Sequence, residues 1–504
     1  MSEAYSPSLG QGAKAARAIP RDNRFYLVCV AVLSFLGLFL TRFPGEMNPD
    51  SQSQFEQAIS GVYNDWHPPV MARLWSVFRY GADGTWTMFL FQIVCYGAAF
   101  TLLALAMNYR GRPVSAWVVL LVGLFPPFLM QVINIHKDVG LAVTVLLAFA
   151  LAIHFRFRSR PIPVLVQICI ALLLAYAALV RVNGYFAVLP AAIFVWYPAF
   201  LRRPIIASIV TIVLSVVLVP VSGLVNNGLL QARSAGAMRT LQIFDLAGIG
   251  YFSGDASVLA GSISLEQLKG CYSPLIADPF YHGNRCGFVW DAVAGTHDTP
   301  SGLSADPDVA GKTIPGHPLG SMWLQAIATR PIAYLEHRIT HFNSEMQFMT
   351  SSHEADIRHV ISVVSGQPSV IPAPSASHRM LDLIRYGIWA TPAFWLAVGL
   401  LVLAVTYDAR RRKDHVDTAS LTLALSGGIY IAAFFNIGVA SDPRYQLWGM
   451  IAIFVATIFA APTLVRQARQ RSLPLALAFA VFCLVIATMV VCRWILPDPL
   501  FGVA

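Results

Sequence analysis

Charged residues are scarce in this chain. Only 12% of its 504 residues are Asp, Glu, Lys or Arg, 56% are hydrophobic, and the mean hydropathy is +0.61. Because soluble domains carry about 25% charged residues, this composition excludes an ordinary soluble protein. Apolar runs long enough to cross a hydrocarbon layer of about 30 Å recur toward both ends of the sequence. We therefore expect an integral membrane protein.

Metal and nucleotide motifs are also missing. The sequence has no C-x-x-C pair, no His/Cys cluster with zinc spacing, no Walker loop, no G-x-G-x-x-G after a strand and no G-x-S-x-G elbow. His337 and His341 stand four residues apart on an expected helix, but without H-E-x-x-H they are interpreted as core or solvated histidines. The net charge of +9 does not indicate nucleic acid, because the basic residues form short clusters between apolar runs.

Long apolar runs are absent between residues 226 and 385, and this gap divides the chain. We expect an all-α polytopic membrane protein with a mixed external soluble domain inserted between the seventh and eighth of about eleven spans. The expected spans lie near residues 25–41, 85–107, 115–135, 138–155, 162–180, 184–200, 204–225, 386–406, 418–437, 445–464 and 473–492. The expected regions are a cytoplasmic tail (1–24), an N-terminal membrane region (25–225) whose first external loop is 42–84, the soluble domain (226–385) and a C-terminal membrane region (386–504).

Basic clusters in alternate loops indicate the orientation. They contain Arg110 and Arg112; Arg156, Arg158 and Arg160; Arg202 and Arg203; Arg410, Arg411, Arg412 and Lys413; and Arg466, Arg469 and Arg471. Cytoplasmic loops carry such an excess of Lys and Arg, so we expect the N-terminus inside and residues 226–385 outside. Cys271 and Cys286 are the two cysteines of that external region, where oxidising conditions favour a disulfide between them.

The first external loop contains an unusual stretch, DSQSQFEQAISGVYNDWHPP, from Asp50 to Pro69. Ser51 and Gln54 have capping-box spacing, and Phe55, Ala58, Ile59 and Val62 follow at i, i+3, i+4 and i+7, which predicts a short amphipathic helix with Asp50 at its start. Pro68 and Pro69 predict a second short helix with apolar residues Val70, Leu74, Val77 and Phe78. Asp50 and His67 would then lie at the membrane edge. The alternative is that Asp50 only caps the helix and His67 is solvated.

Further ionisable and polar residues fall at span ends on the same external face. Ionisable residues at such positions are costly unless they are paired or face water, so together they predict a shared cavity. Beside Asp50, Asp65 and His67 they are His136, Lys137, Asp138, Arg181, Asn183, Asp442, Arg444 and Tyr445. The Phe125-Pro-Pro-Phe128 stretch should kink the third span nearby.

These elements resemble the GT-C superfamily of polytopic glycosyltransferases, which includes protein mannosyltransferases and the lipid A aminoarabinose transferase. The matching residues are Asp50 and Trp66-His67-Pro68-Pro69 in the first external loop, Lys137-Asp138 at the fourth span and Asp442-Pro443-Arg444-Tyr445 near the C-terminal spans. Many members carry two adjacent acids in the first loop, whereas here Ser51 follows Asp50. No cofactor is therefore predicted, and a divalent metal stays open without support.

The resemblance implies transfer of a sugar from a polyprenyl-phosphate donor to a lipid, glycan or protein acceptor at the external (periplasmic) face of the inner membrane. Lys137, Arg181 and Arg444 would bind the donor phosphate, and Asp50 would be the catalytic base of an inverting reaction. His67, Asp65, His136, Asp138, Asn183, Asp442 and Tyr445 would support them. The alternatives are an enzyme like an O-antigen ligase or polymerase, or a multi-span transporter, although no repeated halves are visible.

Overall fold

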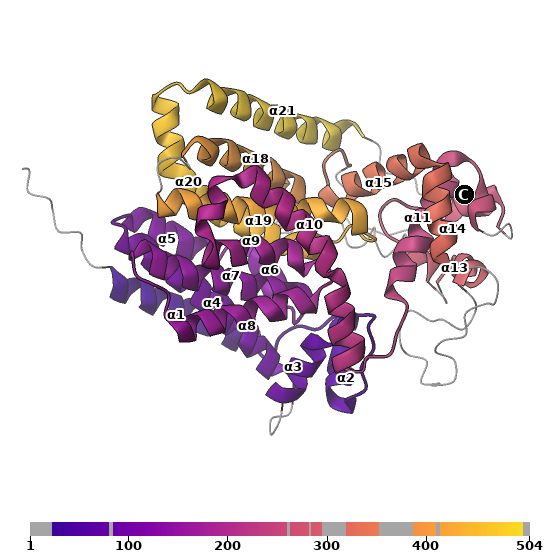
Figure 1. The fold of residues 1–504 in the computed structure, drawn as a ribbon, viewed down its shortest axis with the longest axis horizontal. Coiled ribbons are helices and arrows are strands. Elements are labelled where there is room, and N and C mark those ends of the chain that lie inside the picture. The colour runs from indigo at the N-terminus through magenta and orange to yellow at the C-terminus, as the bar shows by residue number, and fades with distance from the viewer. Residues whose placement is uncertain are drawn as a thin grey trace, which may run out of the picture.

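The computed structural model describes residues 23–79, 84–259, 263–281, 284–294, 319–351, 387–409 and 414–496. These residues form α-helices joined by short 3-10 turns. Within these ranges, pairing of the β type is limited to isolated bridges. The structure is therefore an all-α protein, as the hydropathy of the sequence predicts (Figure 1).

Seven helices in the described ranges are long and apolar enough to cross a membrane. They are α1 (Arg24–Thr41), α4 (Trp86–Tyr109), α7 (Lys137–Phe157), α10 (Pro204–Gly223), α19 (His415–Ile437), α20 (Leu447–Arg469) and α21 (Leu473–Ile495). α5 (Pro113–Val122) and α6 (Pro126–Val132) make an eighth candidate that is bent by 49°. The bend lies at Phe125-Pro126-Pro127 and confirms the expected kink, since both prolines occupy the first turn of α6.

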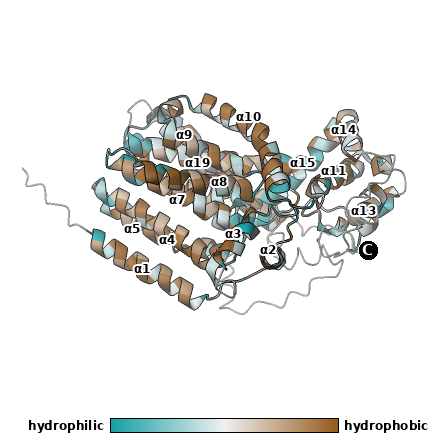
Figure 2. Ribbon diagram, turned by 60° about the horizontal axis from the view of Figure 1, so that its bottom comes forward, coloured by the Kyte–Doolittle hydropathy of each residue, from teal (hydrophilic) through white to brown (hydrophobic). Residues whose placement is uncertain are grey.

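Three shorter apolar helices complete this body: α8 (Val164–Val180), α9 (Gly184–Trp196) and α18 (Pro392–Ala409). α7 lies at the centre of this body and packs against α4, α8, α9 and α20. Of the residues in the most apolar stretch of α7, 78% are buried. For α1, α10 and α21 the corresponding share is only 17%, 22% and 11%. Figure 2 shows how apolar the outer helices α1 and α10 are. Exposed apolar faces of this kind suit a lipid environment.

Two short helices follow α1, as expected, but the residues that they bury differ from the predicted apolar faces. In α2 (Pro49–Ser60) the buried residues are Ser51, Gln54, Gln57 and Ala58, whereas Ile59 is exposed. In α3 (Val70–Phe78) they are Met71, Ala72 and Trp75, and Val77 is exposed. The predicted apolar faces are therefore wrong in part, because α2 turns its polar side chains toward the helical body.

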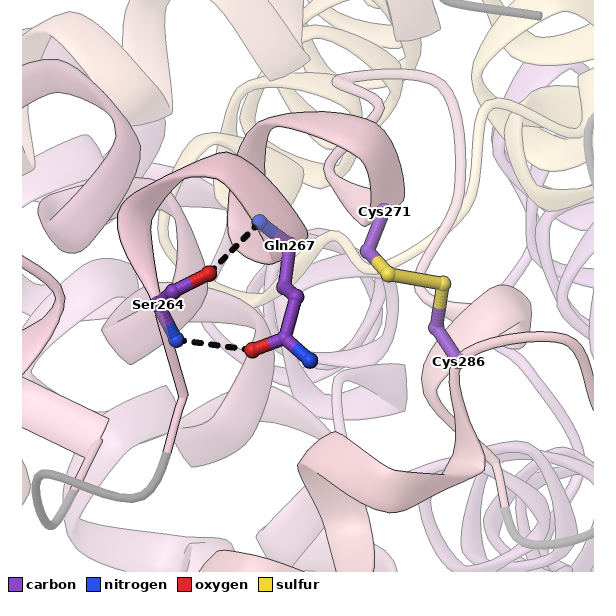
Figure 3. Close-up of a disulfide and its surroundings, with 4 residues drawn as sticks. All are labelled: Ser264, Gln267, Cys271 and Cys286. Atoms are coloured by element: carbon purple, nitrogen blue, oxygen red, sulfur yellow. Dashed lines mark hydrogen bonds between the residues drawn. A yellow bond between two sulfur atoms is a disulfide. The ribbon is translucent and has the colours of Figure 1, made fainter.

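The middle of the chain has a separate hydrophobic core built from α11 (Ala237–Ser253), α12 (Leu265–Cys271), α13 (Gly287–Ala294), α14 (Leu319–Thr329) and α15 (Pro331–Met346). Figure 1 shows these helices grouped at one end of the helical body. We expected a mixed domain here, but its described residues form helices and loops without a strand. Cys271 and Cys286, the pair selected from the sequence, are joined by a disulfide close to the capping box of Ser264 and Gln267 (Figure 3).

Candidate functional site

The predicted site residues come from four distant parts of the chain and converge at one end of the helical body. α2 supplies Asp50, the loop before α3 supplies His67, the start of α7 supplies Lys137 and Asp138, and the turn before α20 supplies Arg444. The side chains of the polar cluster are Asp50, His67, His136, Lys137, Asp138, Arg181, Asp442, Arg444 and Tyr445.

Backbone contacts hold α2 against the beginning of α7. The N–H of Ile135 donates to the carbonyl of Glu46 at 2.8 Å, and the N–H of Glu46 donates to Ile133 at 3.0 Å. The hydroxyl of Ser51 also donates to the carbonyl of Ile135. Ser51 is fully buried by this contact, which explains why a polar residue occupies the inner face of α2. Its neighbour Asp50 is thereby placed beside His136.

Asp50 is one of the partly exposed members of the cluster, together with Asp442 and Arg444. Its carboxylate lies 3.1 Å from Nε2 of His136, 3.5 Å from Nε2 of His67 and 3.1 Å from Nη2 of Arg444. The Asp50 side chain is 28% exposed, against 2% for His136 and 8% for His67. Burial raises the pKa of Asp50, but the hydrogen bonds of His136 and His67 and the charge of Lys137 outweigh it and hold this pKa well below its usual range. Asp50 is therefore an ionised carboxylate that contacts three side chains and keeps part of its surface accessible.

Both histidines are neutral near pH 7. Burial and the charge of Lys137 lower the pKa of His67 to about 4, and burial lowers that of His136 to about 4 as well. The ammonium of Lys137 contacts Nδ1 of His67, which leaves the N–H of His67 on the nitrogen that faces Asp50. Nδ1 of His136 lies 2.5 Å from Asp138 and Nε2 lies 3.1 Å from Asp50, so the ring stands between the two carboxylates and, being neutral, can donate to one of them.

The three predicted cations differ in their partners. Arg181 pairs with Asp138, and Arg444 pairs with Asp442 at 2.6 Å in addition to Asp50. Lys137, which is 9% exposed, contacts a neutral imidazole instead. Its charge is thus the one least compensated by a direct carboxylate contact within the cluster. The ring of Tyr445 lies between the two guanidinium groups, 4.5 Å from that of Arg181 and 5.4 Å from that of Arg444.

A tight turn between α8 and α9 positions Arg181. The N–H of Gly184 donates to the carbonyl of Arg181 at 2.9 Å, and Asn183 is buried at the N-cap of α9. A Cβ at Gly184 would lie 2.2 Å from the carbonyl oxygen of Ala177. The close approach of the two helices therefore requires glycine here.

Asp65 was expected to support the proposed catalytic and phosphate-binding residues, but its hydrogen bonds lie elsewhere. Its carboxylate accepts a hydrogen bond from the N–H of Ala235 at 2.5 Å and one from the amide of Asn227 at 3.3 Å. The N–H of Asp65 also donates to the carbonyl of Arg233. Asp65 thus fastens the first loop to the segment that follows α10, and the short sequence distance to His67 is misleading.

Sequence reasoning missed a segment that reaches the cluster from the middle of the chain. Residues 274–281 pair with the strand-like stretch before Asp442: Ala277 N–H donates to Val439 and Ser441 N–H donates to Leu275, both at 2.8 Å. Asp278 belongs to this segment. Burial and the charge of Asp50 raise the pKa of Asp278 to about 6. No local motif marks these residues, since the pairing joins positions more than 150 residues apart.

A second buried network lies between α11 and α15. Asp245 accepts from Arg338 at 2.5 Å and lies 3.2 Å from His337, and Arg338 donates to the carbonyl of Gly438 at 2.7 Å. All three side chains are fully buried. Burial lowers the pKa of His337 and, to about 3, that of His341. These are core histidines, as the lack of H-E-x-x-H suggested, and the network ties the middle region to the stretch before Arg444.

Neither a cofactor nor a metal is indicated by the arrangement. No group of three His, Cys, Asp or Glu residues suited to a metal ion occurs in the described part of the chain. In addition, the charges of Lys137 and Arg444 act directly on the nearest candidate ligands, Asp50 and His136. Comparison of the chain with known proteins finds no matching family model, no matching curated protein and no matching solved structure.

Proposed function

We propose that this protein is a membrane glycosyltransferase of the GT-C type, which moves a sugar from a polyprenyl-phosphate donor to an acceptor. The observation that carries the proposal is Asp50, a partly exposed carboxylate held by two buried histidines and an arginine at the end of apolar helices. The resemblance of Asp50 and Trp66-His67-Pro68-Pro69 to the first external loop of that superfamily points the same way.

The position of the cluster suits a lipid-linked donor. Lys137 and Asp138 begin the central apolar helix α7, so a phosphate next to them would stand at the membrane edge while its polyprenyl chain stays among lipids. Lys137 is the cation we assign to this phosphate first, because Arg181 and Arg444 already pair with carboxylates. Arg444 would turn from Asp50 toward the phosphate when the donor binds.

The reaction would use the ionised state of Asp50. The acceptor hydroxyl oxygen attacks the anomeric carbon, the bond from that carbon to the phosphate oxygen breaks, and polyprenyl phosphate leaves with the electron pair. The hydroxyl proton passes to Asp50. Attack opposite the leaving group inverts the anomeric centre. A low pKa makes Asp50 a weak base in the ground state, but it guarantees the carboxylate form that orients the hydroxyl and stabilises the developing charge.

The cluster and the basic clusters lie at opposite ends of the helical body. α7 runs from Asp138 to Arg156 in its last turn, about 27 Å along its axis. At the basic end, Arg156 donates to the carbonyl of Val195 and Arg110 pairs with Asp414. In the proposed topology of eleven spans, the site faces the outside of an inner membrane and the basic end faces the cytoplasm, as the excess of Arg at that end favours. Reporter fusions after Arg203 and after Lys413 should both read cytoplasmic, and an external signal at either would overturn this orientation.

The function is tested with purified protein and undecaprenyl-phosphate monosaccharides carrying glucose, mannose or arabinose. We expect release of undecaprenyl phosphate from at least one of them, by hydrolysis or by transfer to a lipid or peptide acceptor. A transporter would move the lipid across a proteoliposome without breaking the sugar–phosphate bond. A ligase or polymerase would require a diphosphate-linked oligosaccharide. Either result would replace the present proposal.

A further inference from the structure

Residues 274–281 lie beside the stretch that leads to Asp442, and hydrogen bonds on both sides fix their backbone. The bridge between Ile276 and Ala440, with hydrogen bonds of 2.8 Å on both sides, holds the segment beside the stretch that leads to Asp442. On its other side the Cys271–Cys286 disulfide closes the loop. The amide of Asn284 donates to the carbonyl of Asp278, and the N–H of Cys286 donates to that of Pro279.

Asp278 lies in the electrostatic range of the proposed active site. Burial is the largest cause of its raised pKa, the charges of Asp50 and Asp442 add to it, and the charge of Arg444 opposes them. The Asp278 residue is half-buried. The hydroxyl of Tyr281 donates a hydrogen bond to the carboxylate of Asp278.

Aromatic rings accompany this carboxylate. The ring of Tyr281 packs edge-on against Trp66 with 5.6 Å between centroids, and against Trp290 at 6.0 Å. Trp66 is the residue before His67, so these rings join the segment to the first external loop. An aromatic wall with one or two placed hydrogen-bond acceptors suits a sugar, whose C–H faces pack on rings and whose hydroxyls donate to a carboxylate.

We propose that residues 274–281 form the sugar subsite of the active site, in which Asp278 accepts hydrogen bonds from hydroxyls of the transferred sugar and Tyr281 with Trp66 covers one face of its ring. The inference rests on the proposed function. It assigns specificity for the sugar to the middle region of the chain, while Lys137 and Asp50 serve the phosphate and the acceptor. Asp278 is thus a substrate-binding residue and takes no proton in the reaction.

The experiment compares binding of bare undecaprenyl phosphate with binding of the undecaprenyl-phosphate monosaccharide that the wild type prefers. The Kd for the bare lipid divided by the Kd for the sugar-bearing lipid gives the gain in affinity that the sugar subsite alone provides. Asp278→Asn should lower this ratio about tenfold or more, since a hydrogen bond to a charged acceptor is lost, and should leave the Kd for the bare lipid unchanged. Tyr281→Leu, which keeps the carboxylate, should lower the ratio severalfold and serves if Asp278→Asn does not fold. Glu266→Gln, at an exposed carboxylate of α12, is the control and should change neither Kd.

An unchanged ratio in both folded variants overturns the inference, and so does an equal loss for both lipids, which would mean that the segment only stabilises the site. Failure of the proposed function looks different, because the wild type would then release undecaprenyl phosphate from none of the monosaccharide lipids, whichever of them it binds.

Discussion

The side chain of Asn48 accepts a hydrogen bond from the backbone N–H of Ser51 at 2.9 Å. Asn48 is therefore the N-cap of α2, and Asp50 stands inside the first turn. This arrangement removes the alternative in which Asp50 serves only as a cap, and it makes the two roles separable by substitution.

Asp50→Asn should lower turnover on the order of 10²–10⁴-fold with donor binding retained, because an amide cannot accept the proton of the acceptor. Arg444 keeps Asp442 as a partner, so the variant should fold. Asn48→Ala is the matched control: it should cost about 0.5–2 kcal/mol of stability and leave turnover per folded molecule near that of the wild type. Single-turnover rates and donor Kd values measured on both variants decide the point. Near wild-type turnover in Asp50→Asn would end the assignment.

Lys137→Gln tests the phosphate contact. We expect the Kd for undecaprenyl phosphate to rise about tenfold or more, since a charge-assisted hydrogen bond is worth roughly 1.5–3 kcal/mol. Binding of uncharged undecaprenol should not change. Arg42, which is exposed and pairs with Glu46 at 3.4 Å, provides the control in Arg42→Gln, with at most a small effect on either lipid. A parallel loss for phosphate and alcohol would show that Lys137 only shapes the cluster.

Arg181→Ala is expected to act on folding before it acts on donor binding. Asp138 is 2% exposed and would keep only the neutral ring of His136 beside it, and removing the charged partner of a buried carboxylate costs about 3–5 kcal/mol. Asp138→Asn should relieve much of this cost, so the double variant should be more stable than Arg181→Ala alone. Thermal unfolding in detergent of the two single variants and the double variant gives the coupling between them. Additive effects would contradict a direct pair.

The sequence was a good guide to the helices and a partial one to the site. Hydropathy located the long helices, because a span is a local property of about 20 residues. Charges at span ends led to Lys137, Asp138, Arg181 and Arg444, because buried ionisable groups need partners and therefore collect.

The predictions that failed concern residues whose partners are distant in the sequence. Ser51 is buried because of Ile135, and Asp65 belongs with Ala235 and not with its near neighbour His67. Asp278 reaches the cluster through backbone pairing with the stretch before Asp442, which no periodicity or motif records. The apolar face assigned to α2 failed for the same reason, since the surface it meets is polar.

Glu345 gives a prediction for pH, because it is a carboxyl group that burial keeps neutral. It lies on α15, is 2% exposed, and accepts a hydrogen bond from the amide of Gln446 at 2.7 Å. Burial raises its pKa to about 8, although that hydrogen bond and the charges of Arg181 and Arg338 oppose the change. In the unfolded chain the group ionises near its ordinary pKa of 4.5. Between these values the folded state binds more protons than the unfolded state.

Stability should therefore fall as the pH rises from about 4.5 to 8, by about 1.4 kcal/mol per pH unit from this group alone. Glu345→Gln mimics the neutral acid and keeps the acceptor for Gln446. It should match the wild type at pH 4.5 and exceed it at pH 7 by up to about 3 kcal/mol. Glu336→Gln, at an exposed position of the same helix, should not alter the pH profile. The measurement is thermal unfolding of the three proteins in detergent between pH 4.5 and 8. A Glu345→Gln protein that is less stable than the wild type by the same amount at every pH would show that Glu345 is needed as a carboxyl group and does not set the pH dependence.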